Sequence, residues 1–202
     1  MTADRAIGMA AFRRILGQFA TGVTVITVQH DGRTHGMTAN TFTSVSLDPP
    51  LVLFCVARTA RMTAFVVDAE GFAVNILADN QQEASRHFAG SRKDEAPSAV
   101  RLHPGPVAPL LEGSLASLSC ATEAVYEGGD HLIVLGRVIE LHEGTRASPL
   151  VFFRSRYCDV LEGEMAPVEP GELWSNDAIQ VYHAEWTEGD DSSFADEPLA
   201  PW

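Results

Sequence analysis

The stretch from residue 35 to residue 50 is rich in small and hydroxyl-bearing side chains and ends directly before the apolar run 51–56. A backbone with few bulky side chains can approach a flat ligand closely and point its N–H groups at it. A serine- and threonine-rich loop that only satisfies its own backbone is the alternative interpretation. The candidate contact residues of this stretch are Thr38, Ala39, Asn40, Ser44, Val45 and Ser46.

Two further places along the chain could hold a ligand. Arg58, Arg61 and Thr63 surround the start of a helix predicted over residues 60–67. Guanidinium groups and free amides at a helix start suit a phosphate, and an ordinary helix cap with solvated arginines is the alternative. Asn75 lies inside the apolar run 72–77, where a buried amide must find partners. Those partners are either the neighbouring backbone or a ligand.

His131 begins a predicted strand directly after Gly128-Gly129-Asp130. A single histidine at a strand start is usually structural or solvent-exposed, and catalysis is the less common role. The chain contains no G-x-G-x-x-G after a strand, no phosphate-binding G-x-x-x-x-G-K-[ST], no G-x-S-x-G and no H-E-x-x-H. The histidines lack metal-ligand spacing, and the three cysteines are far apart without a C-x-x-C pair, so no metal site is expected. These absences favour a bound cofactor as the source of the chemistry.

Composition narrows the class of protein. A chain of 202 residues with 46% hydrophobic and 20% charged residues is typical of one soluble domain. The net charge is −13, but all 14 basic residues lie within residues 1–156 and 12 of the 27 acidic residues lie within 157–202. No basic stripe is available for nucleic acid, and no apolar run is long enough for a membrane span. The first residues lack the apolar core of a signal peptide, and the cysteine pattern fits the reducing cytoplasm.

Hydrophobic periodicity predicts a mainly β chain with flanking helices. Phe12, Ile15, Leu16 and Phe19 form one face of a helix that Gly22 would end, and we expect this face to pack in the core. A second helix follows Asp79, its expected N-cap, as far as residue 88, and residues 90–109 are expected to form a loop. Strands are expected at residues 23–29, 34–38, 51–56, 71–77, 114–126, 131–142 and 150–153. The first two are joined by an Asp31-Gly32 hairpin turn. Such short strands suggest a closed β-barrel with helices at its mouth, built as a domain of residues 1–159 with a C-terminal extension of residues 160–202.

Four motifs in this order resemble the short-chain flavin reductases that serve two-component monooxygenases. They are FRRILGQFATGVTV from residue 12, the TAN…TSVSLDPP run from residue 38, FAVNIL from residue 72, and Gly129-Asp130-His131. The resemblance covers residues 12–157. It implies a flavin-binding split β-barrel, usually a homodimer, that uses NAD(P)H to reduce FMN or FAD.

The resemblance also implies roles for individual residues. The segments 38–40 and 44–46 would contact the isoalloxazine ring, and Arg61 and Thr63 would lie at a phosphate, although the family commonly has serine where Arg61 stands. His131 would face the nicotinamide side of the flavin. Asn75 and the helix end at Phe88 and Ala89 would contact the flavin, and Arg156 or Tyr157 would hold the pyridine nucleotide.

The expected function is therefore an NAD(P)H:flavin oxidoreductase that passes reduced flavin by diffusion to a separate flavin-dependent oxygenase. A tightly bound flavin carrier without pyridine-nucleotide activity is one alternative, and a reductase of a corrinoid or ferric complex is another. FMN against FAD and NADH against NADPH remain open, with a preference for FMN and NADH by analogy with the family.

The C-terminal extension combines acidic residues with large aromatic ones, including Trp174, Tyr182 and Trp186. Aromatic side chains gain much free energy from burial, which is unusual for a purely disordered segment. We expect residues 174–186 to fold back on the barrel or its dimer mate near the flavin, and residues 188–197 to stay mobile.

Overall fold

The computed structural model describes residues 7–90 and 100–160. Contacts divide the chain into Met1–Val160 and Leu161–Trp202, and the described residues all belong to the first of these units. The expectations for residues 174–186 and 188–197 lie outside the described residues. No described helix is both long and apolar enough to cross a bilayer.

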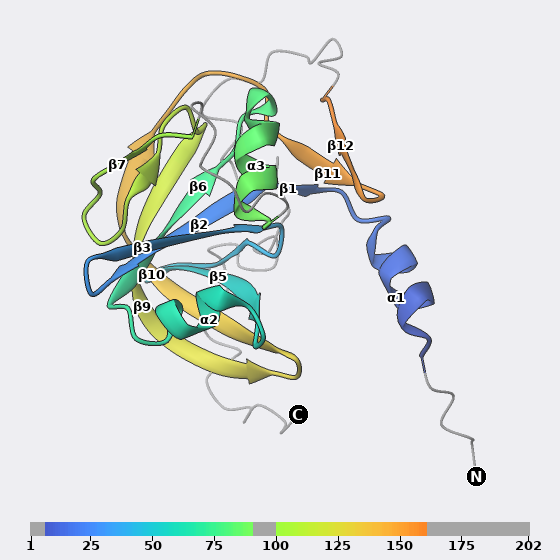
Figure 1. Cartoon of the computed structure of the whole chain (residues 1–202), viewed down its shortest axis with the longest axis horizontal. Coiled ribbons are helices and arrows are strands. Elements are labelled where there is room, and N and C mark those ends of the chain that lie inside the picture. Colours follow the sequence, from blue (N-terminus) through green and yellow to red (C-terminus); the bar gives the residue numbers. More distant parts are fainter. Residues whose placement is uncertain (1–6, 91–99, 161–202) are drawn as a thin grey trace, which may run out of the picture. The chain divides into compact units, whose positions relative to one another are not determined.

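A seven-stranded antiparallel sheet forms the body of the described fold (Figure 1). Its strand order is β3-β2-β6-β9-β10-β5-β4, so that β3 and β4, consecutive in the chain, form its two edges. The strands are β2 (Thr24–His30), β3 (Arg33–Ala39), β4 (Thr43–Leu47), β5 (Pro50–Ala57), β6 (Gly71–Ile76), β9 (Ala116–Gly128) and β10 (His131–Glu143). The sheet therefore confirms the mainly β prediction.

Two tight turns shape the sheet. Asp31 and Gly32 have φ values of 50° and 70°, the positive pair that two-residue hairpins between twisted strands require. This hairpin confirms the turn expected from the sequence. Gly129 has a φ of 73° in the turn between β9 and β10, which places His131 opposite Ala57 of β5.

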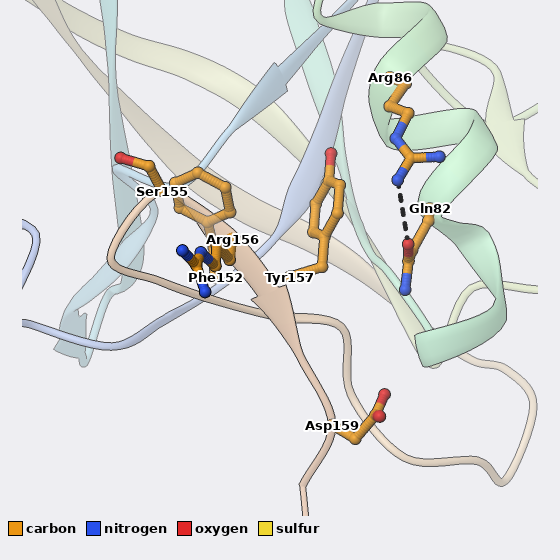
Figure 2. A pocket seen from close by; sticks show the side chains of 7 residues that line it. All are labelled: Gln82, Arg86, Phe152, Ser155, Arg156, Tyr157 and Asp159. Atoms are coloured by element: carbon orange, nitrogen blue, oxygen red, sulfur yellow. Dashed lines mark hydrogen bonds between the residues drawn. The ribbon is translucent and has the colours of Figure 1, made fainter.

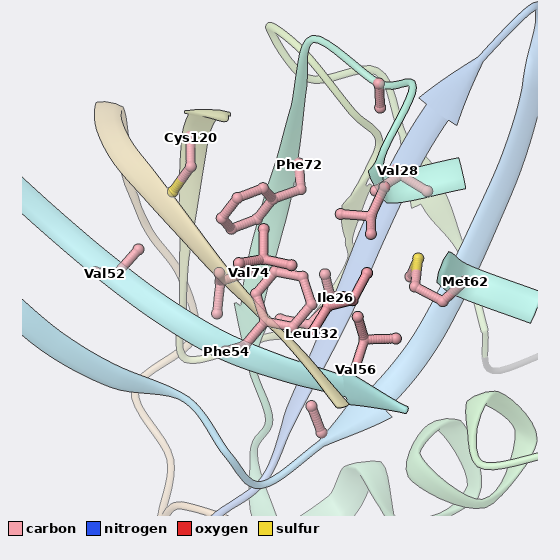
Figure 3. Packing of buried hydrophobic residues seen from close by; sticks show 14 residues of the cluster. Ile26, Val28, Val52, Phe54, Val56, Met62, Phe72, Val74, Cys120 and Leu132 are labelled. Carbon is pink, nitrogen blue, oxygen red and sulfur yellow. The ribbon is translucent and has the colours of Figure 1, made fainter. Parts of the chain in front are cut away.

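The main core lies against the sheet face that α2 (Arg61–Val66) covers (Figure 3). The rings of Phe54 and Phe72 meet edge to face at 5.0 Å, and Met62 and Val66 of α2 are buried beside them. Such fully buried side chains each contribute roughly 1.5–3 kcal/mol. The sheet and α2 are thus joined into one hydrophobic unit.

A second core cluster joins α3 (Gln82–Phe88) to a small sheet. The small sheet has the order β1-β11-β12, from Thr21–Gly22, Val151–Phe153 and Arg156–Cys158. Leu77 and Leu150 are buried between these elements, and the ring of Phe88 lies where a Cβ on Gly36 would be. The remaining elements are the 3-10 turn η1 (Asp79–Gln81) and the short strands β7 (Leu102–His103) and β8 (Leu110–Leu111).

The first helix differs most from its prediction. α1 spans Met9–Leu16 and ends at Gly17, well before Gly22. Its apolar face was expected in the core, but the exposed fractions are 47% for Phe12, 66% for Ile15, 56% for Leu16 and, just beyond the helix, 77% for Phe19. Hydrophobic periodicity identifies the apolar side of a helix but not what that side contacts.

Three smaller differences concern residues with polar or hydroxyl side chains. The strand β4 was not expected, because serine and threonine make up most of its sequence. The strand β12 was not expected either, because three residues are too short for a periodic pattern. Asp79 lies inside η1 and bonds the next backbone N–H, so it is not the N-cap of the longer helix. The segment 90–109 was expected to be a loop, but it includes β7.

Candidate functional site

The edge strand β4 contains a β-bulge at Val45. Ser44 pairs with Val52 and Ser46 with Leu51, which leaves the backbone of Val45 outside the β4–β5 ladder. Bulges often lie beside functional sites, where they redirect backbone groups. Because β4 has no neighbour on its other side in the sheet, its outer edge presents backbone donors and acceptors.

The connection between β3 and β4 runs beside the end of β5. Thr41 accepts the backbone N–H of Cys55 at 3.0 Å and donates to its carbonyl at 3.2 Å. Ala39 is buried and Asn40 is exposed. Thr41 was not predicted as a site residue, although hydroxyl groups that bond backbone in this way are common in such segments. Thr41 therefore holds the candidate segment 38–40 against β5.

The start of α2 and the start of β10 meet at Ala57, the last residue of β5. Thr63 donates its hydroxyl to the Ala57 carbonyl at 2.8 Å, and His131 lies opposite Ala57 in the sheet. The Thr63 hydroxyl is therefore used inside the protein, as in the cap interpretation of this segment. Arg61 is exposed at the first position of α2.

His131 is half-exposed, with 43% of its side chain accessible to solvent. Its Nδ1 lies 2.7 Å from Oδ1 of Asp130, and among the described residues Nε2 has no hydrogen-bond partner. A histidine held by one ring nitrogen can offer the other to a substrate. Arg58, the residue after Ala57, contacts the turn that precedes His131, because its Nε donates to the Gly129 carbonyl at 2.9 Å.

A second histidine, His35 of β3, packs against α2. His35 stacks on Phe65 with ring centroids 4.9 Å apart, and the guanidinium of Arg33 lies 5.4 Å from the same ring. Burial lowers the pKa of His35, and the charges of Arg61 and Arg33 lower it further. This corner of the fold is therefore cationic through its arginines while His35 favours the neutral state.

Asn75 is completely buried, and its amide group is fully used. The side-chain nitrogen donates to the Val25 carbonyl at 3.0 Å and to Thr27 Oγ1 at 3.3 Å. Its oxygen accepts from the Leu111 N–H at 2.9 Å and from Ser117 Oγ at 2.8 Å. Two donors and two acceptors are all that an amide offers. The amide of Asn75 therefore bonds within the protein, as in the first alternative, and its contact with the flavin stays a prediction.

The remaining candidates gather around α3 and β12 (Figure 2). Ser85 Oγ lies 2.8 Å from the Tyr157 hydroxyl, and Thr38 donates to the Ser85 carbonyl at 2.6 Å. Arg86 stands over the Tyr157 ring at 5.5 Å. Phe88 is half-buried against β3, and Ala89 is exposed at the end of α3. These bonds connect Tyr157 through α3 to the candidate segment of β3.

An open pocket of about 430 Å³ lies between α3 and the small sheet. Arg156 and Tyr157 were predicted from the sequence, whereas Arg86 was not, because a polar helical face carries no signal of what lies opposite it. Two guanidinium groups with two aromatic rings suit an anionic ligand that has a flat portion. The lining residues are Gln82, Arg86, Phe152, Ser155, Arg156, Tyr157 and Asp159.

The chain is similar in sequence to known proteins. The sequence model described as "Flavin reductase like domain" matches residues 16–161. A reductase subunit of a flavin-dependent monooxygenase from Rhodococcus jostii is 40% identical over 166 residues, which is 82% of this chain and 85% of the relative. The reductase component of 4-hydroxyphenylacetate 3-monooxygenase from Thermus thermophilus is 40% identical over 147 residues, 73% of this chain and 93% of the relative.

A solved structure is similar in three dimensions as well. The NADH:FAD oxidoreductase of Streptomyces globisporus, solved with NAD and FAD fragments, matches with a TM-score of 0.72 and 41% sequence identity. The match covers 77% of this chain and 94% of that protein.

Proposed function

The chain belongs to the flavin reductase like domain family, and we propose that it reduces FMN or FAD with NADH and supplies the reduced flavin to a separate flavin-dependent monooxygenase. The resemblance noted in the sequence and the expected split-barrel fold are both confirmed by these relatives. Relatives whose names state the donor are NADH-dependent, and those names include both an FAD and an FMN reductase. The relatives support the reductase over the flavin carrier and over reductases of other acceptors.

One observation carries this proposal: the segment 38–41, the start of α2 and His131 meet at the end of β5. The residues fit a flavin, because the bulged edge strand offers backbone groups to the rim of a planar ring. Arg61 lies at the same corner and can neutralise a phosphate. Bound flavin supplies a ring that accepts hydride at N5 from C4 of the nicotinamide.

The chain's own contribution is positioning. The bulge at Val45 and its neighbours Ser44 and Ser46 orient the ring edge, and Thr38 to Asn40 form the adjoining wall. His131 offers Nε2 on the side from which the nicotinamide approaches. Holding two flat reactants in contact at the right distance can remove a large part of the activation barrier. Phe88 supports this arrangement by fixing the approach of α3 to β3.

The pocket between α3 and β12 is assigned to the pyridine nucleotide in this proposal. Arg156 and Arg86 supply positive charge for its phosphates, and Tyr157 supplies a ring that Ser85 holds in place. Ala89 lies at the end of α3, where we place the ribityl chain of the flavin. We also assign the protein to the cytoplasm, where NADH and reduced thiols are available.

His131→Ala tests the assignment of the nicotinamide side. Flavin reduction by NADH, followed by stopped-flow absorbance, is expected to slow by a factor that corresponds to about 1–3 kcal/mol. Flavin affinity is expected to stay nearly constant. Loss of flavin with an unchanged reduction rate per bound flavin would show that His131 belongs to the flavin-binding residues instead.

We further propose that a second copy of the chain covers the exposed face of α1. An apolar helical face that is left in solvent is typical of an interface, and closed homodimers are the most common assembly. α1 contributes no buried residue of its own, so Ile15→Asp is expected to leave the monomer folded. Sedimentation velocity at micromolar concentration should show a dimer for the wild type and a monomer for the variant. A monomeric wild type would contradict this assembly.

A further inference from the structure

The turn before His131 is fixed from the end of β5 by Arg58. The Arg58 backbone N–H donates to the Asp130 carbonyl at 3.0 Å, and its Nε donates to the Gly129 carbonyl at 2.9 Å. The guanidinium also forms an ion pair with Glu127 on the strand that enters the turn. Gly129 adopts a positive φ that other residues rarely tolerate. The backbone and side chain of Arg58 together therefore hold Glu127, Gly129 and Asp130 of this hairpin end.

The contact between Asp130 and His131 restricts how the imidazole carries its proton. An ionised carboxylate can only accept hydrogen bonds, so the nitrogen 2.7 Å from Oδ1 must be the donor. The neutral ring then has its proton on Nδ1 and a lone pair on Nε2. The pKa of Asp130 lies below its usual value, first through the hydrogen bond from His131 and then through the charges of His131 and Arg13. Asp130 is therefore ionised at neutral pH.

We propose that Asp130 is a positioning residue that fixes His131 in the Nδ1–H form with Nε2 directed to the substrate, and that Arg58 holds the turn carrying both. This inference rests on the proposed function, because Nε2 acts on a nicotinamide only in a reductase. Asp130 is 86% exposed and His131 43% exposed. Exposed pairs contribute little to folding, so the contribution expected here is to geometry and proton placement.

Nuclear magnetic resonance on the flavin-free chain tests the proton placement without any turnover. Imidazole ¹⁵N shifts at a pH where the ring is neutral distinguish Nδ1–H from Nε2–H. We expect the Nδ1–H form in the wild type and a mixture in Asp130→Asn, because an amide can turn either its oxygen or its nitrogen toward the ring. The Nε2–H form in the wild type, or an unchanged spectrum in the variant, would overturn the proposal.

Stopped-flow kinetics on the flavin-loaded protein test the consequence. Asp130→Asn is expected to lower the limiting rate of flavin reduction about 10-fold, the low end of the range found for groups that orient metal-bound histidines. Flavin affinity and the unfolding midpoint should not change. Arg58→Ala should lower the rate in the same direction and raise hydrogen exchange at the amide of residue 58, since the turn it holds is released.

Glu123→Gln is the matched control, because it removes an exposed carboxylate of the same hairpin that pairs with Arg137 and not with His131. Its reduction rate and ring proton placement should match the wild type. Equal loss of rate in the control and in Asp130→Asn would refute the positioning role. If the wild type itself fails to oxidise NADH, the proposed function is wrong. The ¹⁵N shifts of His131 still test whether Asp130 fixes the ring proton on Nδ1.

Discussion

Replacing Asn75 with alanine provides the sharpest test of how the barrel is held together. The side chain is completely buried and bridges β6 to β2, β8 and β9 through four hydrogen bonds. In Asn75→Ala the Leu111 N–H and the Ser117 hydroxyl both lose their acceptor. Thr27 keeps a partner, because its hydroxyl donates to the Pro109 carbonyl.

The loss of folding stability follows from these two groups that lose their hydrogen-bond partner. A buried donor left without a partner costs about 1–3 kcal/mol, so the two groups together give about 2–6 kcal/mol, and the small cavity adds to this loss. That is a large share of the roughly 5–15 kcal/mol that stabilises a typical domain. Flavin affinity per folded molecule should stay the same, because no part of the amide is left free for a ligand.

Urea denaturation of the purified protein measures the loss, and fluorescence titration with flavin measures the affinity of the remaining folded fraction. Asn75→Asp is the informative companion, because a carboxylate still accepts from Leu111 and Ser117 but places a charge in the core. It is expected to destabilise at least as much as alanine at neutral pH. A variant that unfolds like the wild type but binds flavin at least tenfold more weakly would refute this account and return Asn75 to the cofactor site.

Two other predictions concern the packing of α3 and the reactivity of the thiols. Gly36→Ala should weaken flavin binding and lower the melting temperature in thermal unfolding, because the new Cβ would occupy the position of the Phe88 ring. An unchanged flavin affinity would show that the position of Phe88 does not matter for the flavin site. Burial raises the pKa of Cys120 to about 12, so at pH 9 only about 0.1% of this thiol is ionised. Mass spectrometry after treatment with iodoacetamide should therefore find Cys120 unmodified and the half-exposed Cys158 alkylated. Rapid alkylation of Cys120 in the folded protein would contradict its place in the core.

Several elements were predictable because their signals are local. The Asp31-Gly32 turn identifies its hairpin through the positive φ values that it requires. The apolar run of β5 likewise predicts a strand, and the glycines at 128 and 129 predict the turn between β9 and β10. Family motifs then located the candidate site, which no single stretch of sequence would have done.

Other features depend on contacts between distant segments, and local sequence patterns do not predict such contacts. The amide of Asn75 was recognised as needing partners, but whether they were protein or ligand depended on where β8 and β9 pass. The bulge at Val45 arises from a register shift between two strands and leaves no mark in the composition. The exposed face of α1 looks identical in sequence to a buried one.

The pairing of β10 with β5 has a consequence for folding. The hairpins β2–β3 and β9–β10 join neighbours in sequence and can form early, whereas 71 residues separate Arg58 from Gly129. Closing that loop carries an entropic cost that is offset only when the distant strands β5 and β10 pair. We therefore expect the cofactor surface to form late in folding, when β5 and β10 pair. Flavin that binds this surface is then expected to stabilise the native state by mass action and not to guide the earlier steps.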